Sequence, residues 1–469
     1  MTSDGDKMPT AAKRRAVVVG GGPAGGLMAV YLSRIRGFEI DLFEALEEDR
    51  VAGPTIRSWN VVLSGRGLVA LEAGGVDLEK EAGERVIVMT GCVRHHAQEK
   101  LSPSFAGTSS ICRGDLAKTL LEKAAGMPNV NVHFGCALTG VDLDKRVAIF
   151  ERGNGDVVEV GYDMLVGADG VNSRVRKSLE ESVPDFTVRQ REDHMAFKTI
   201  EIPIMGMEEA DESWKERFHV INSEVGCIGA APHSGGKLTA VVILPSSGKT
   251  SFGALMKTTQ DVRGFFGRHY PSAFGGEGPS VEVAKDFHER RTQQLRSTYC
   301  SRLAHGRIVL IGDAAHSMWA SLGQGVNSAL EDCRVLAQVL DSAAEGEAAA
   351  AAQGIDVPVA LEAFNEQRLE DATAACVLSE RGMGGARTFR PMFAARLYLT
   401  VLLHKTLGSV APEMFTPPSI MTVNSADKRY GDILRGVERE DAVASGLLFG
   451  TVAMVVAAVA TRFMRRRNV

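Results

Sequence analysis

Three short motifs hold the residues of this chain whose types and spacing are best suited to chemistry. They are Gly20-Gly21-Gly22-Pro23-Ala24-Gly25, Gly167-Ala168-Asp169-Gly170 and Gly312-Asp313-Ala314-Ala315-His316. Glycine lets a backbone approach a pyrophosphate closely, and a carboxylate accepts hydrogen bonds from the hydroxyls of a ribose or a ribityl chain. Each motif alone is a weak signal, but in this order and at this separation the three predict a bound FAD.

A strand, a turn and a helix are predicted around the first motif. The apolar run 16–19 is typical of a buried parallel strand. Gly20, Gly22 and Gly25 follow with the spacing of a dinucleotide-binding turn, which directs the N–H groups of the next helix at the phosphates. A second strand, 38–43, ends at Glu44, whose carboxylate can accept a ribose hydroxyl and disfavours a 2′-phosphate. The alternative is a glycine-rich turn in an ordinary α/β domain.

The last motif favours FAD over NAD. It follows the buried-strand pattern 307–311, which places Asp313 where a ribityl hydroxyl needs an acceptor. Gly323-Gln324-Gly325 then opens a helix whose N-terminus suits the anionic edge of a reduced flavin, although a plain helix start is the alternative. A single histidine such as His316 is more often structural. We therefore assign no catalytic side chain and expect the cofactor to carry the chemistry.

The composition is that of a globular enzyme with a large core. The chain has 469 residues, a net charge of −5 and 45% hydrophobic residues. Its basic residues are scattered, so no nucleic-acid partner is predicted. The seven cysteines are odd in number and contain no C-x-x-C pair, which argues against a disulfide framework and against a zinc site. No metal is predicted.

The predicted fold class is α/β with an inserted sheet. A Rossmann-like FAD-binding domain is expected to be discontinuous, formed by residues 12–185 and 296–342. Alternating apolar segments in 186–295 predict an antiparallel sheet, which would form one wall of a substrate cavity. Residues 346–440 are expected to form a helical C-terminal region.

A terminal transmembrane helix is predicted at 442–464. Residues 442–461 contain no charged side chain, are long enough to cross a bilayer, and are followed by four arginines. This pattern predicts a tail anchor with the catalytic domain facing the cytosol. The mitochondrial outer membrane is favoured, with the endoplasmic reticulum or plastid envelope as alternatives. An interfacial or protein-packed helix is the other interpretation, because the segment is rich in alanine and glycine.

The motif set resembles that of the class A FAD-dependent aromatic monooxygenases, which have the p-hydroxybenzoate-hydroxylase-like fold. It is most similar to the kynurenine 3-monooxygenase family. The likeness is carried by Arg57-Ser58-Trp59-Asn60 through Ala70-Leu71, by Gly312-Asp313-Ala314-Ala315-His316, by Gly323-Gln324-Gly325-Val326-Asn327, and by Glu331-Asp332-Cys333. The spacing of Pro412, Phe415, Pro417, Met421 and Tyr430 is similar too, so the resemblance covers nearly the whole chain.

The resemblance implies a cofactor site and a reaction. FAD contacts are implied at Gly25, Glu44, Arg113, Leu138, Asp169 and Asp313, and backbone contacts near Val62, Gly325, Val326 and Asn327. The implied activity uses NADPH or NADH and O₂ to hydroxylate a small aromatic substrate, namely kynurenine to 3-hydroxykynurenine. The nicotinamide is expected to visit without a Rossmann domain of its own.

The substrate side departs from the family pattern. The family's P-F-F is Ala320-Ser321-Leu322 here, and its late tyrosine falls on Ser419. Arg94 is the candidate to bind an amino acid's carboxylate, and Phe105 loosely matches a tyrosine. These departures leave open a hydroxylase or epoxidase of another substrate, a flavin reductase, and a tail-anchored interaction protein that keeps FAD only for folding.

Overall fold

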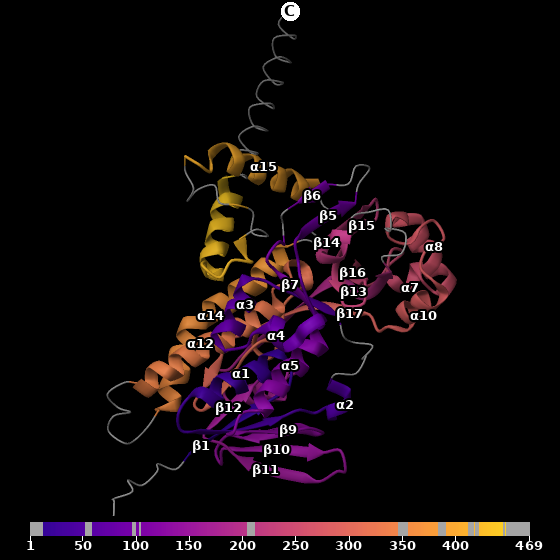
Figure 1. Cartoon of the computed structure of the whole chain (residues 1–469). Helices are drawn as coiled ribbons and strands as arrows, with labels where there is room; N and C mark the ends of the chain where they lie inside the picture. The colour runs from indigo at the N-terminus through magenta and orange to yellow at the C-terminus, as the bar shows by residue number, and fades with distance from the viewer. Residues whose placement is uncertain are drawn as a thin grey trace, which may run out of the picture.

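The structure is a computed structural model of the chain. The residues that it describes are 13–51, 59–95, 100–102, 105–203, 212–345, 355–382, 391–410, 417, 422–443 and 446. Two sheets dominate these residues, one mainly parallel and one mainly antiparallel. Figure 1 shows the helices of the C-terminal region at one end of the molecule and a small three-stranded sheet at the other.

The mainly parallel sheet has six strands in the order β18-β19-β12-β1-β2-β8. Only the pair β18–β19 is antiparallel. Their bounds are Ala304–His305 (β18), Ile308–Leu310 (β19), Met164–Gly167 (β12), Arg14–Val19 (β1), Phe38–Phe43 (β2) and Val130–His133 (β8). The central strand is apolar along most of its length because helices cover the sheet, and Ala16, Val17 and Val18 are fully buried.

The helices around this sheet pack in one continuous group. Helix α1 lies between α5 and α12, and α12 also contacts α3 and α14. Their bounds are Pro23–Arg34 (α1), Gly65–Ala73 (α3), Arg113–Ala125 (α5), Gly325–Glu345 (α12) and Val357–Arg381 (α14). Smaller helices are Glu48–Val51 (α2), Leu78–Ala82 (α4), Arg174–Ser182 (α6) and Asp313–His316 (α11). Helix α15 is Pro391–Leu407, and a further helix covers 430–443.

The second large sheet has seven strands in the order β17-β13-β16-β15-β14-β5-β6. The bounds are Gln293–Cys300 (β17), Val188–Pro203 (β13), Lys237–Pro245 (β16), Gly226–His233 (β15), Arg217–Ser223 (β14), Gly91–His95 (β5) and Lys100–Ser102 (β6). Neighbouring strands are antiparallel except β14 and β5, which are parallel. The sheet therefore takes two strands from well before residue 186, beyond the segment 186–295 that the sequence suggested.

One face of the seven-stranded sheet is covered by four helices. They are Phe252–Leu255 (α7), Thr259–His269 (α8), Pro271–Phe274 (α9) and Val281–Glu289 (α10). Ile200 and Ile202 of β13 pack with Phe266 and Phe287 of these helices in one buried cluster. The opposite face carries Phe197, whose ring meets Trp59 edge-on at a centroid distance of 6.0 Å. Trp59 precedes β3, so this face looks toward the mainly parallel sheet.

Two small sheets complete the fold. Asn60–Leu63 (β3), Ser109–Cys112 (β7) and Val86–Val88 (β4) pair antiparallel, with β7 in the middle. The side chains of Asn60 and Ser110 both donate hydrogen bonds to the carbonyl of Pro232 on β15, at 2.7 and 2.6 Å. This sheet therefore joins the two large ones. Cys136–Asp142 (β9), Val147–Arg152 (β10) and Val157–Gly161 (β11) form a separate meander.

The predicted terminal transmembrane helix needs correction. Most of 442–464 lies outside the described residues, and within the described ones no helix combines the length and apolar composition needed to cross a membrane. The physical weakness of the prediction is that alanine and glycine, which make up much of this segment, add little apolar surface per residue. The fold class that the described residues show is α/β with an antiparallel sheet and a helical C-terminal region, and these residues contain no membrane-spanning helix. The predicted membrane location depended on that span.

Candidate FAD site

The three sequence motifs meet at one edge of the mainly parallel sheet. Gly20, Glu44, Asp169 and Asp313 follow β1, β2, β12 and β19, and these four strands run in the same direction side by side. Backbone hydrogen bonds join the motifs directly, since the N–H of Ala168 donates to Val19 O at 2.8 Å. Ligands of open α/β sheets bind at this edge, at the carboxyl ends of the strands.

Glycine is required at two positions of the first motif, Gly20 and Gly25, because no side chain fits there. Gly20 has φ +102°, and a Cβ on it would lie 2.5 Å from the carbonyl oxygen of Ala168. A Cβ on Gly25 would lie only 1.8 Å from the carbonyl oxygen of Gly20. A Cβ on Gly22 would meet nothing within 4 Å, so it would project into open space at the start of α1. That open space beside a helix N-terminus is where a pyrophosphate fits.

Glu44 supports the same turn with its carboxylate. One oxygen accepts the N–H of Gly21 at 2.5 Å and the other accepts the N–H of Leu46 at 2.8 Å. The side chain is half-buried, so it remains accessible beside the turn. A carboxylate held in this way is a fixed acceptor for a ribose hydroxyl.

Asp169 and Asp313 differ in their surroundings. Asp169 Oδ2 accepts the N–H groups of Arg174 and Val175 at 2.6 and 3.2 Å, at the start of α6. Its other oxygen, Oδ1, is buried with no hydrogen-bond partner among the described residues, and burial raises the pKa of this carboxyl. Asp313 is exposed although Ala314 and Ala315 beside it are buried. Both carboxyls thus keep an oxygen able to accept a hydroxyl of FAD.

The loop before α12 is fixed against β3. Asn327 is fully buried, and its amide donates to the carbonyls of Val62 and Gly323, both at 2.9 Å. Its Oδ1 accepts the N–H of Ser64 at 2.8 Å. The structure thus brings together the segments of Val62, Gly325, Val326 and Asn327. Gly312 lies beside the same helix, because its Cβ would be 3.0 Å from Ala329.

The remaining predicted site residues lie on other elements. Arg113 is exposed at the start of α5, with its guanidinium 5.8 Å from the centre of the Trp59 ring, and Leu138 is buried on β9. Arg94 lies exposed on β5, which three strands separate from β13, and Phe105 stacks on Phe218 of the neighbouring β14 with a ring-centroid distance of 4.3 Å. Arg94 and Phe105 therefore lie on or beside the β14–β5 pair of the seven-stranded sheet, whereas the glycine motifs follow strands of the mainly parallel sheet. Ser419 lies outside the described residues.

The segment that departs from the family pattern lies between the seven-stranded sheet and α14. Ala320–Leu322 forms a short 3₁₀ helix, and the hydroxyl of Ser321 donates to the carbonyl of Ser379 on α14. Trp319 just before it is buried against Phe197 and Leu295 of the seven-stranded sheet. The indole N–H of Trp319 has no partner in the described part of the chain.

A buried cluster of charged side chains beneath the site was missed by the sequence analysis. We call it the charge cluster: Arg66 (α3), His316 (α11), Glu331 and Asp332 (α12), and Arg368 (α14). Glu331 joins Arg66 and Arg368, each at 2.9 Å, while Asp332 joins Arg368 and His316, each at 2.6 Å. Asp332 also accepts the N–H of Gly312 at 2.8 Å. Two adjacent acids on the apolar face of a predicted helix were the signal that could have revealed it.

Electrostatics favour the charged forms of Asp332 and Arg368 in this cluster. Burial alone would raise the pKa of Asp332, but the charges of His316 and Arg368 outweigh it and lower that pKa. Burial likewise opposes the charge on Arg368, and the carboxylates of Asp332 and Glu331 more than compensate, so its pKa is raised. The arrangement explains why His316 is a structural residue: its ring is 2% exposed and bonded to Asp332.

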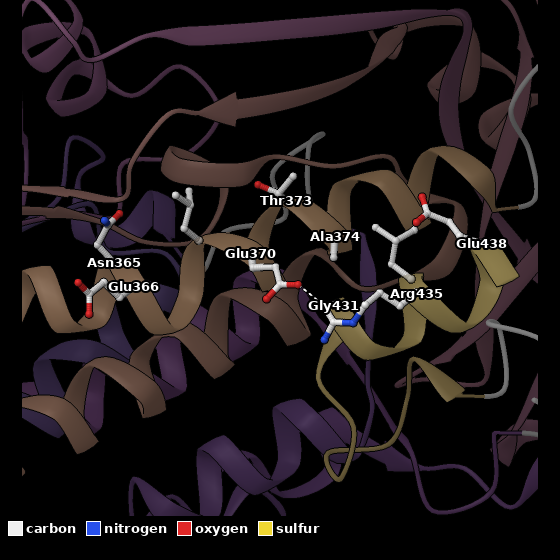
Figure 2. Close-up of a pocket in the computed structure, with 10 residues that line it drawn as sticks. Asn365, Glu366, Glu370, Thr373, Ala374, Gly431, Arg435 and Glu438 are labelled. Atoms are coloured by element: carbon white, nitrogen blue, oxygen red, sulfur yellow. Dashed lines mark hydrogen bonds and ion pairs between the residues drawn. The ribbon is translucent and has the colours of Figure 1, made fainter. Parts of the chain in front are cut away.

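A cavity of about 570 Å³ lies apart from the glycine motifs, between α14 and the helix 430–443 (Figure 2). Glu366, Glu370 and Glu438 lie along it, and Arg435 forms ion pairs with Glu370 and Asp432. Its polar groups are thus mostly carboxylates with one cation already paired. These residues do not include any of the flavin motifs.

Comparisons with known proteins agree with this geometry. Residues 13–356 match the family model described as FAD binding domain. Kynurenine 3-monooxygenase of Salinispora arenicola (strain CNS-205) is 30% identical over 97% of this chain and 98% of its own length. That of Legionella pneumophila (strain Lens) is 32% identical over 70% of this chain and 72% of its own.

Solved structures share the fold. A mutant of 2-methyl-3-hydroxypyridine-5-carboxylic acid oxygenase matches with a TM-score of 0.61 and 22% identity, over 82% of this chain and 97% of that one. Klebsiella pneumoniae HpxO, solved with FAD and uric acid, matches with a TM-score of 0.61 and 19% identity, over 88% and 97%. The first motif is the dinucleotide turn that such a cofactor needs. The chain belongs to the kynurenine 3-monooxygenase family of FAD-dependent monooxygenases.

Proposed function

We propose that the chain hydroxylates L-kynurenine to 3-hydroxykynurenine with NADPH as electron donor. The proposal is supported by curated relatives of that activity that cover nearly the whole chain. When bound, FAD accepts electrons from the nicotinamide and activates O₂ for transfer to an electron-rich ring. The chain's own residues must hold the cofactor, orient the aromatic ring against it and keep water away.

The observation that carries the proposal is the apolar wall facing the flavin edge. Phe197, Leu295 and Trp319 are buried together on the face of the seven-stranded sheet opposite its helices, and Trp59 meets Phe197 edge-on. A planar aromatic substrate can stack or pack edge-on against such side chains, which also exclude water. We place the substrate between this wall and the edge formed by Gly20, Asp169 and Asp313.

The cofactor residues follow from the same placement. We propose that Gly20, Gly22, Gly25 and Glu44 bind the pyrophosphate and ribose, while Asp169, Asp313 and the segments of Val62 and Gly325–Asn327 bind the rest of FAD. Arg113 and Leu138 are proposed at its periphery, and Arg94 and Phe105 as the weaker substrate candidates. The domain bounds proposed with them are 12–185 with 296–342, 186–295 and 346–440, except that β5 and β6 pair with the sheet of 186–295.

The test uses the full chain purified with FAD. NADPH oxidation and O₂ uptake are measured with and without L-kynurenine, and the product is identified by mass spectrometry. We expect substrate-stimulated NADPH oxidation and a product one oxygen heavier. If NADPH reduces the flavin but neither result is seen, kynurenine would be rejected as the substrate and another aromatic compound favoured. The side chains of Ala320–Leu322 are smaller than those of the family pattern and would suit a different ring. A flavin that NADPH cannot reduce even with substrate would favour the interaction protein.

A further inference from the structure

The C-terminal segment 422–435 reaches into the loop that opens α12. Tyr430 is fully buried, and its hydroxyl donates to Oε1 of Gln324 at 2.8 Å. The amide of Gln324 in turn donates to Oδ1 of Asn424 at 2.9 Å and to the carbonyl of Leu322 at 3.2 Å. Gln324 is the middle residue of the Gly323-Gln324-Gly325 turn, so residues about 100 positions later fix its side chain on both ends.

The same segment is bound to the charge cluster. The guanidinium of Arg66 lies over the Tyr430 ring at 4.0 Å and donates to the carbonyl of Val423 at 2.9 Å and to that of Lys428. A cation over an aromatic face is attractive, more so when both are removed from water. Arg66 therefore contacts one face of the Tyr430 ring, while the Tyr430 hydroxyl donates to Gln324.

Helix α14 fixes the segment from the other side. The N–H of Gly431 donates to Oδ1 of Asp371 at 3.0 Å, and Nε of Arg429 donates to Oδ2 of the same carboxylate at 3.0 Å. Asp371 lies one turn beyond Arg368 of the charge cluster, 3.7 Å from its guanidinium. Both contacts flank Tyr430 in sequence, so its backbone has little freedom.

We propose that Tyr430 and Asn424 are positioning residues of the flavin site: they hold Gln324, and through it the N–H groups at the start of α12. This rests on the FAD site proposed above. The start of α12 lies beside the dinucleotide turn, since a Cβ on Gly312 would be 3.5 Å from Ala24 and 3.0 Å from Ala329. N–H groups at a helix start stabilise negative charge, and they do so best when their direction is fixed before the charge develops.

Protonation does not interrupt this role. Burial raises the pKa of Tyr430 well above its usual range, so the hydroxyl remains a donor at working pH. Oε1 of Gln324 has Tyr430 as donor, and Nε2 of Gln324 has two acceptors. The Gln324 amide therefore has one favoured orientation. Among the described residues, Tyr430 is the only hydrogen-bond donor to Oε1 of Gln324, so loss of its hydroxyl leaves that oxygen without a donor.

The test compares Tyr430→Phe with a matched control, Tyr31→Phe. Tyr31 is also buried in the mainly parallel domain, and its hydroxyl donates to the carbonyl of Ala70 at 2.6 Å, away from Gln324. Each variant loses one buried hydroxyl hydrogen bond. We expect FAD binding to weaken roughly threefold to tenfold in Tyr430→Phe, the equivalent of one hydrogen bond, and little in Tyr31→Phe. We also expect a more negative flavin midpoint potential in Tyr430→Phe alone.

Neither readout needs the aromatic substrate, so failure of kynurenine turnover leaves the test intact. If Tyr430→Phe does not yield folded protein, Asn424→Ala serves instead, because Asn424 is only half-buried and should shift both readouts in the same direction by less. Equal potentials for Tyr430→Phe and Tyr31→Phe, or an unchanged potential in Asn424→Ala where it is the variant used, would overturn the proposal.

Discussion

The flavin edge and the seven-stranded sheet bury polar groups in opposite ways. Beneath the flavin edge, five ionisable side chains form the charge cluster, in which each carboxylate contacts at least one basic side chain. In the sheet, His219 and His95 are buried as a pair, with Nδ1 of His219 and Nε2 of His95 2.8 Å apart, and His219 Nε2 contacts the carbonyl of Trp214. Burial lowers the pKa of His219 to about 4, so this ring is neutral.

The two regions also offer ligands different chemistry. The flavin edge presents backbone N–H groups, glycines and two aspartates, a set suited to one invariant cofactor. The sheet presents Phe197 and Leu295, and Trp319 packs against them, so the ligand-facing groups here are apolar side chains. We infer that backbone groups determine cofactor binding here, while side chains determine the choice of substrate.

The largest expected effect is at the dinucleotide turn. Gly25→Ala would place a Cβ 1.8 Å from a carbonyl oxygen, so we expect a destabilised protein without flavin. Gly22→Ala separates folding from binding, because its Cβ meets no protein atom. We expect Gly22→Ala to fold normally and to bind FAD roughly 10- to 100-fold more weakly, since overpacking costs about 1–3 kcal/mol. FAD titration followed by flavin fluorescence measures this.

Gly140→Ala on β9 is the control, because its added Cβ also meets nothing within 4 Å. It should bind FAD like the unmodified chain. Equal FAD affinity in Gly22→Ala and Gly140→Ala would show that the space beside Gly22 is not used by the cofactor.

This contrast also explains what could be predicted from the sequence. The turn at Gly20–Gly25 and the acceptor Glu44 are local patterns in one strand–turn–helix–strand unit, and the family match agrees with the predicted cofactor. The charge cluster was not predicted, because Arg66 and Glu331 are 265 positions apart and no periodicity links them. The parallel pairing of β5 with β14 is equally nonlocal. The predicted terminal span depended on length and flanking charge, and the described residues contain no helix that could cross a membrane.

The free energy of unfolding should depend on pH through the buried His219 of the seven-stranded sheet. In the unfolded chain a histidine takes up a proton near pH 6.5, whereas His219 in the fold does so only near 4. The unfolded state therefore binds more protons between these values, and stability falls as the pH drops from about 6.5 to 4. The loss attributable to His219 is at most about 3 kcal/mol. Urea unfolding at pH 7 and pH 5 measures it.

His219→Gln should reduce this pH dependence, and His194→Gln, which changes an exposed histidine of β13, should leave it intact. Asp332 of the charge cluster should contribute little in this window, because His316 and Arg368 hold its pKa below the usual range. An unchanged slope in His219→Gln would mean that other groups control acid stability.

The smallest expected effect is at the wall of the proposed substrate site. Trp319→Leu removes an aromatic ring beside Phe197 while keeping an apolar side chain, so KM for L-kynurenine should rise about threefold to tenfold, from the roughly 0.5–1.5 kcal/mol of an aromatic contact. FAD affinity should hardly change, because Trp319 lies on the sheet side. Trp214→Leu is the matched control, since Trp214 is buried with the helices on the other face of the same sheet. If both variants raised KM equally, the effect would reflect sheet stability, and the division between a backbone-built cofactor site and a side-chain-built substrate site would fail. If Trp319→Leu weakened FAD binding and Trp214→Leu did not, the cofactor site and the substrate site would share Trp319. The apolar wall would then contact the flavin itself.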